Sequence, residues 1–231
     1  MRFRRKIVIT FSILLGIAFI IEYFLGMKPM SFYKNMENFL LKATHPLSYY
    51  GTHTFVFIII PIFLFYLTAL STFEPQVVLR IGSKKRNCLA KLNLNMILVV
   101  IFIIVNFFIG FIYPMVFRVD ILHNQFWRMY LWQCVLWGVY LIIIGNIVLF
   151  LRVFIRNKLV GLGIVYFGTL INFIFRNYFY CVIVDFDILN SHFALGHSVH
   201  PFKLLMYLLG MFIFTFAINL FVCSEEEYYE I

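Results

Sequence analysis

The chain has 231 residues, of which 63% are apolar and 13% are charged. Ordinary soluble domains carry about 25% charged residues, and a water-soluble globule needs a polar surface that this composition cannot supply. The net charge is +9, but the basic residues stand in short clusters between apolar runs, which is typical of cytoplasmic membrane loops. Composition therefore excludes a soluble or disordered chain, disfavours a nucleic-acid partner, and predicts that the lipid bilayer is the solvent.

Six apolar runs are long enough to cross a bilayer, which takes about 20 helical residues. None shows the alternation of a transmembrane strand, so each run is predicted to be a helix with its backbone hydrogen-bonded internally. The predicted spans cover residues 7–25, 54–70, 96–117, 127–151, 159–175 and 204–222. We therefore expect an all-α membrane protein with a single transmembrane domain over residues 1–231 and no soluble domain.

Lys and Arg are unevenly shared between the loops on the two sides of the membrane. The N-terminal segment and the loops after the second and fourth spans carry more of them than the opposite loops. The positive-inside rule then predicts cytoplasmic N- and C-termini. The basic start before a long apolar run, with no cleavage site after it, predicts an uncleaved signal anchor. All six histidines are predicted to lie outside the spans: His45, His53, His123, His192, His197 and His200.

The two long outer loops have different patterns. In the loop 27–52, Phe32, Met36, Phe39 and Leu40 recur at the period of an amphipathic helix, which predicts a helix lying on the outer surface. The loop 177–202 begins with an apolar stretch, 178–184, that is too short to span and is followed by two acids. This pattern predicts a re-entrant or interfacial segment. The two acids are Asp185 and Asp187.

Polar residues within the predicted spans are costly in hydrocarbon and therefore informative. Two roles are open for them: hydrogen bonds between helices, or the polar lining of a transport pathway. These residues are Glu22, Asn106, Gln133, Asn146, Asn172 and Asn219. Glu22 is also close enough to the outer end of the first span to be a simple interfacial acid. Catalytic or metal-binding patterns are missing: the outer-loop histidines match no standard site, and four widely spaced cysteines form neither a CxxC nor a recognisable disulfide framework.

The inner loop 73–95 has the most distinctive pattern. Glu74 and Pro75 suit a helix start, Gly82 would end that short helix, and Ser83 would cap the next one. The following basic run then leads into the third span. One interpretation is a basic loop that binds anionic lipid headgroups; the other is a docking helix for a cytoplasmic partner.

The segment 74–86, EPQVVLRIGSKKR, resembles the E…RxGSRK segment that follows the second span in small bacterial permeases linked to antimicrobial-peptide export and immunity. These permeases are membrane subunits of ABC-2-type exporters, so the resemblance implies the six-helix transmembrane domain of that class (type V). It also implies that the loop 73–95 is a coupling helix seated in a cleft of an ATPase subunit. The sequence departs from the pattern at Asn87, near which many relatives have an aromatic residue. The matched or adjoining positions are Glu74, Arg80, Ile81, Gly82, Ser83, Lys84, Lys85 and Arg86.

The resemblance further implies the partners. They are two copies of an ABC ATPase, which would bind the ATP and Mg, and a second permease chain, identical or related. The implied cargo is an amphipathic peptide or a lipid-like molecule, and the implied location is the bacterial cytoplasmic membrane. The chain itself is expected to hold no cofactor and to be no enzyme, because GxxxxGK[ST], GxGxxG, HExxH and GxSxG are all missing from its sequence. The alternatives are an ion-coupled carrier or channel that works without an ATPase and, behind it, an intramembrane enzyme.

Overall fold

The computed structural model describes residues 9–10, 13–14, 16–17, 52–70, 84–116, 124–155, 157–175 and 201–225. These residues are helical except for the two positions on either side of residue 156, and they contain no strand. The helical segments are α3 (Thr52–Thr54), η2 (Phe55–Ile59), α4 (Ile60–Leu70), α6 (Lys84–Val116), α7 (Asn124–Phe154), α8 (Lys158–Phe175) and α10 (Pro201–Glu225).

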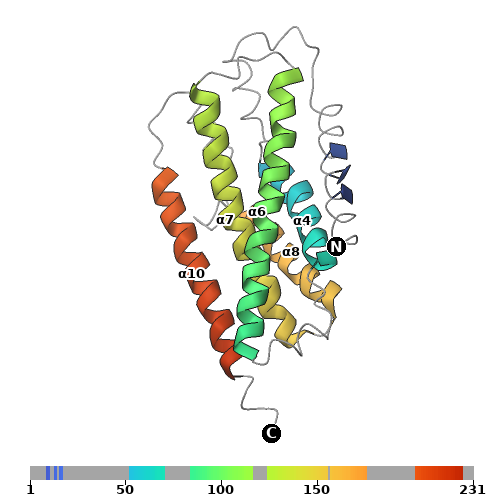
Figure 1. The fold of residues 1–231 in the computed structure, drawn as a ribbon, viewed down its shortest axis with the longest axis vertical. Helices are drawn as coiled ribbons and strands as arrows, with labels where there is room; N and C mark the ends of the chain where they lie inside the picture. The colour runs from blue at the N-terminus through green and yellow to red at the C-terminus, as the bar shows by residue number, and fades with distance from the viewer. Residues whose placement is uncertain are drawn as a thin grey trace.

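The long helices α6, α7 and α10 run side by side along the long axis of the molecule (Figure 1). The most extensive packing is between α7 and α10, followed by α6 with α7 and α6 with α10. Helices α4 and α8 lie on the side of this trio away from α10, where each packs more lightly against its neighbours. The start of α6 and the ends of α7 and α10 meet at one end of the bundle, which is the lower end in Figure 1.

Four of the described helices are long and apolar enough to cross a membrane: Cys88–Phe111, Trp127–Phe154, Lys158–Phe175 and Leu205–Val222. A shorter apolar helix covers Thr52–Leu67. The prediction of an all-α membrane protein is confirmed to this extent. Of the first predicted span only Ile9, Thr10, Ile13, Leu14, Gly16 and Ile17 are described, all of them helical. The predicted surface helix in the loop 27–52 and the re-entrant loop 177–202 lie outside the described residues.

Helix α6 begins at Lys84, well before residue 96, where the predicted third span starts. The reason is visible in its burial, because Cys88, Leu92, Asn95 and Val99 are all buried and repeat at helical spacing. The polar first turns therefore have a packed face of their own and continue the helix beyond the apolar segment.

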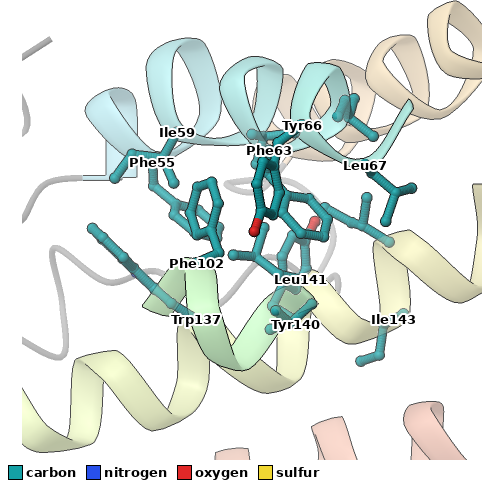
Figure 2. Packing of buried hydrophobic residues seen from close by; sticks show 14 of the residues in the cluster. Phe55, Ile59, Phe63, Tyr66, Leu67, Phe102, Trp137, Tyr140, Leu141 and Ile143 are labelled. Atoms are coloured by element: carbon teal, nitrogen blue, oxygen red, sulfur yellow. The ribbon is translucent and has the colours of Figure 1, made fainter. Parts of the chain in front are cut away.

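The second span packs through large side chains, which point from η2 and α4 toward α6 and α7 (Figure 2). The Phe55 ring stacks on Trp137 with ring centroids 4.6 Å apart. Further along the helix, the Phe63 ring meets Phe102 edge-on at 5.2 Å. Phe63, Phe102 and Phe55 are fully buried. Offset and edge-to-face contacts of this kind are favourable aromatic geometries.

The second span is not a regular α-helix. Residues 55–59 are in π-helical register, and the N–H of Ile60 donates to the carbonyl of Phe55, five residues back. Pro61 follows at once, and a proline has no N–H to donate within a helix. The register change therefore falls where the α-helical hydrogen-bond ladder is already interrupted.

Candidate functional site

Three asparagines from three helices meet inside the bundle. Asn95 comes from α6, Asn146 from α7 and Asn219 from α10, and they are 2%, 0% and 4% exposed, respectively. Each of them stands within or at the start of an apolar run of its helix. A buried amide costs free energy unless it is hydrogen-bonded, so the partners of these three groups decide what the cluster does.

The asparagines bond to one another and to backbone carbonyls across helix boundaries. The Nδ2 of Asn95 donates to Asn146 Oδ1 at 3.0 Å and lies 3.2 Å from the carbonyl of Ile142. The Nδ2 of Asn146 donates to Thr215 Oγ1 on α10 at 3.4 Å. The Nδ2 of Asn219 donates back to the carbonyl of Asn146 at 3.0 Å. We refer to Asn95, Asn146, Thr215 and Asn219 as the asparagine network, because it joins α6, α7 and α10 into one hydrogen-bonded unit.

A glycine lets α6 approach α7 at the network. A Cβ added at Gly145 would lie 2.5 Å from Asn95 Nδ2 and 2.6 Å from Asn95 Cγ. Only a residue without a Cβ leaves room for the Asn95 amide on this surface of α7. The Oδ1 of Asn95 is buried and accepts no hydrogen bond within the described part of the chain. The network is thus tightly packed on one side and has one unused acceptor.

One cysteine lies beside the network. Cys88 is buried on α6 and is disulfide-bonded, and its sulfur is 3.6 Å from the carbonyl oxygen of Asn219. A disulfide sulfur has no hydrogen to donate, so this approach is a packing contact. The spacing of the four cysteines gave no sign of this disulfide, because the fold alone brings residues far apart in sequence together. Cys134 is free and buried in α7.

Two other predicted polar residues lie apart from the asparagine network. Asn106 on α6 and Gln133 on α7 are 0% and 1% exposed. Near them, the hydroxyl of Tyr130 lies 2.5 Å from the carbonyl of Phe107 and 3.4 Å from that of Asn106. The Tyr130 ring stacks on Phe107 with centroids 5.0 Å apart. This second set of polar contacts joins α6 and α7 nearer the opposite end of the bundle.

Asn172, the remaining predicted asparagine, is half-buried on α8. Its Oδ1 is buried and accepts no hydrogen bond among the described residues. The predicted polar residues that the structure describes are therefore divided between separate places, and they do not form one continuous file.

Most of the predicted coupling loop falls outside the described residues. This applies to Glu74, Arg80, Ile81, Gly82 and Ser83, and also to the predicted polar or acidic positions Glu22, Asp185 and Asp187. Lys84 and Lys85 form the start of α6, but their side chains are outside the described set. Arg86, the last residue of the segment, lies in the first turn of α6 and is exposed.

Basic residues gather at the end of the bundle where α6 and α8 begin and α7 ends. Arg86, Lys91 and Lys158 are exposed there, and Arg152 is half-buried. In α8, the Asn157 Oδ1 accepts the N–H of Leu159 at 3.0 Å, as a helix N-cap does. This helix therefore starts at Lys158, shortly after α7 ends at Phe154.

His53 lies just before the predicted second span, and in the structure it belongs to α3, the first turn of that helix. Its ring meets Phe173 of α8 edge-on at 4.9 Å. The first turn of this helix extends two residues beyond the predicted boundary because Thr52 and Thr54 are themselves buried. Among the described residues, no group of three or more His, Cys, Asp or Glu is placed to hold a metal ion.

Asn95, Thr215 and Tyr130 belong to the polar contacts but are not among the residues predicted from sequence. Asn95 precedes the predicted third span by one residue, and its spacing from Asn106 places both on one face of a continuous helix. That periodicity could have pointed to it. No sequence signal marks Thr215 or Tyr130, because their partners are backbone carbonyls and side chains of other helices.

The asparagine network consists of uncharged amides and one hydroxyl, so what it can do chemically is hold helices together and fix their register. It offers neither a general base nor a nucleophile of the usual kind. Comparison of this chain with protein families, with curated proteins and with solved structures gives no match.

Proposed function

We propose that the chain is the permease subunit of an ATP-driven ABC exporter of the ABC-2 class. In this proposal it has six spans and cytoplasmic termini, pairs with a second permease chain and binds two ATPase subunits. The ATPases dock on the loop between α4 and α6 and supply the energy for moving an amphipathic peptide or a lipid-like molecule, in export or in immunity. The observation that carries the proposal is the segment 74–86 with its E…RxGSKKR pattern.

The position of the flanking helices supports a docking role for this loop. Helix α4 runs toward the end of the bundle at which α6 starts, and the exposed Arg86 and Lys91 follow on α6 (Figure 1). Positive charge at this end is the expected mark of the cytoplasmic side. An ATPase on that side would meet a short segment tethered at both ends by membrane helices, so a movement of the segment would act directly on the second and third spans.

Co-purification tests the docking proposal. The tagged chain is purified in mild detergent together with an ATPase encoded beside it, and the ATPase is quantified relative to the chain. We expect stoichiometric recovery with the wild type. Recovery of the chain alone, from cells that express both proteins, contradicts the proposal.

Two loop substitutions test the coupling itself. Glu74→Ala removes the acid and Gly82→Pro removes the backbone freedom of the loop, and both are expected to separate ATP hydrolysis from transport while the chain remains in the membrane. Lys158→Ala is a matched control, because it alters an exposed charge at the same end of the bundle on another helix. If transport in liposomes is unchanged in both loop variants, the loop is not the coupling element. Transport by the chain without any ATPase would instead support an ion-coupled carrier or channel.

A further inference from the structure

The second span changes its helical register in its first third. The π-helical residues Phe55–Ile59 are followed directly by Pro61, so two independent features weaken the same stretch of hydrogen bonds. Sharp bends in helices occur at prolines and at π-bulges, and π-bulges are frequent at functional positions. This stretch is therefore the place in the second span at which bending costs the least backbone hydrogen bonding.

Aromatic side chains within and after this stretch contact different helices. Within the π-turn, Phe55 packs on Trp137 and Tyr140 of α7, and Phe57 meets Phe173 of α8. After Pro61, Phe63 and Tyr66 contact Phe102 of α6, and α4 also packs against α7 and α8. The aromatic rings drawn in Figure 2 can slide over one another without breaking a directional bond.

The three long helices are joined to one another by close packing and hydrogen bonds. α6, α7 and α10 have the most extensive packing in the described part of the molecule, and the asparagine network links all three. Gly145 brings α6 and α7 so close that a Cβ would not fit. Directional bonds and the tight fit of the Asn95 side chain against Gly145 make this trio a rigid frame.

We propose that the π-turn at residues 55–59 and Pro61 form a hinge. Residues 62–70 of α4 swing about this hinge against the frame of α6, α7 and α10. The residues before the hinge, Thr52–Thr54, stay fixed, with the His53 ring against Phe173 of α8. The direction of the driving force rests on the proposed function, since an ATPase on the loop would move residues 62–70, but the hinge is a property of this chain alone.

Distance distributions in the full-length chain, without any ATPase or nucleotide, test the hinge directly. Spin labels are introduced through an unnatural amino acid, so the native cysteines are retained, and the protein is reconstituted in lipid nanodiscs. The test pair is Phe65 of α4 and Val100 of α6, and the reference pair is Val100 and Phe214 of α10; all three positions are exposed. We expect the distribution of the test pair to be about twofold broader than that of the reference pair. Equal widths overturn the proposal.

Removing the proline provides the second part of the test. Pro61→Ala restores a backbone N–H at residue 61, and we expect it to narrow the test-pair distribution to the width of the reference pair and leave the reference pair unchanged. Pro114→Ala is the matched control, because Pro114 also lies within a described helix, α6, but outside the hinge. A test pair that keeps its width in Pro61→Ala, or that narrows equally in Pro114→Ala, contradicts the hinge.

Hydrogen exchange covers the case in which Pro61→Ala does not fold. In the wild-type chain in nanodiscs, the amides of residues 57–60 and 62 are expected to exchange at least ten times faster than those of residues 95–106 in the frame. Uniform protection across the two segments overturns the hinge. Because none of these measurements needs a partner, a rigid second span would refute the hinge and leave loop docking intact, whereas a failed co-purification would leave the hinge intact.

Discussion

Gly145→Ala is the sharpest perturbation of the asparagine network, because it changes no polar group. The new Cβ would lie 2.6 Å from Asn95 Cγ, so the Asn95 amide must move away from α7. That movement breaks its bonds to Asn146 Oδ1 and to the carbonyl of Ile142 together. One methyl group thereby disconnects α6 from α7 at the network.

The size of the effect follows from three contributions. Two interhelical hydrogen bonds in a membrane protein contribute about 0.6 kcal/mol each, and a buried amide left without partners costs about 1–3 kcal/mol. Against this, alanine in place of glycine stabilises a helix by up to about 1 kcal/mol. We therefore expect Gly145→Ala to lower the free energy of unfolding by about 1–3 kcal/mol.

Gly138→Ala is the control on the same helix. Gly138 lies two turns before Gly145 on the same face of α7, and a Cβ there would have Ile103 Cγ1 as its nearest neighbour, at 3.6 Å. That distance is ordinary contact, so this variant should be neutral or slightly more stable than the wild type. Reversible unfolding in mixed detergent micelles with increasing SDS measures both variants. If Gly145→Ala is as stable as Gly138→Ala, the close approach at Asn95 does not hold the helices together and the reasoning is refuted.

A double-mutant cycle separates the clash from other effects of the added methyl. Asn95→Ala removes the three atoms that lie nearest to the new Cβ, so the double variant should lose much less stability than the two single variants add up to. We expect a coupling of about 1–3 kcal/mol, which is in the range for residues in direct contact. Additive effects would show that Gly145 and Asn95 act independently.

Three further measurements address other parts of the structure. Tyr130→Phe removes the donor to the carbonyl of Phe107 and should cost about 1 kcal/mol in the same unfolding assay; an unchanged midpoint contradicts that bond. Asn219→Leu removes the donor to the carbonyl of Asn146 and should weaken the attachment of α10 by a similar amount, about 1 kcal/mol, whereas Phe214→Leu on the exposed face of the same helix should not. Cys88 is disulfide-bonded, but a cytoplasmic position would keep it reduced. Because Cys88 is buried, the cells are lysed directly into SDS with a maleimide, so that burial does not limit labelling. A mass shift that is lost in Cys88→Ser supports the cytoplasmic orientation of this end, and labelling only after a reductant is added contradicts it.

The positions of the helices were largely predictable because their signal is local. A run of about 20 apolar residues must be helical in hydrocarbon whatever surrounds it, and the described helices α6, α7, α8 and α10 fall on such runs. The helix ends were less predictable. α6 continues to Lys84 because Cys88 and Leu92 pack against other helices, and a hydropathy pattern does not contain that contact.

The same holds for the site residues: those that are unusual within an apolar run could be predicted, whereas those defined by a contact with another helix could not. Asn146 and Asn219 stand out in sequence because an amide in an apolar run is costly, and each has an interhelical hydrogen bond. Asn95 did not stand out, because it precedes the apolar run by one residue, and Gly145 did not, because its importance lies in what approaches it. The π-turn was also missed: Pro61 was visible in the second span, but the five-residue hydrogen bond from Ile60 depends on the helix geometry before it.

The sequence by itself determined the solvent and the secondary structure. With 63% of residues apolar and 13% charged, only a membrane chain of helices satisfies both the side chains and the backbone. The tertiary structure decided which faces of those helices meet, and hence that α6, α7 and α10 share the asparagine network while the second span packs through aromatic rings. The physical reason is that membrane helices associate through close packing and hydrogen bonds between particular faces, and hydropathy along one helix contains no information about its neighbour.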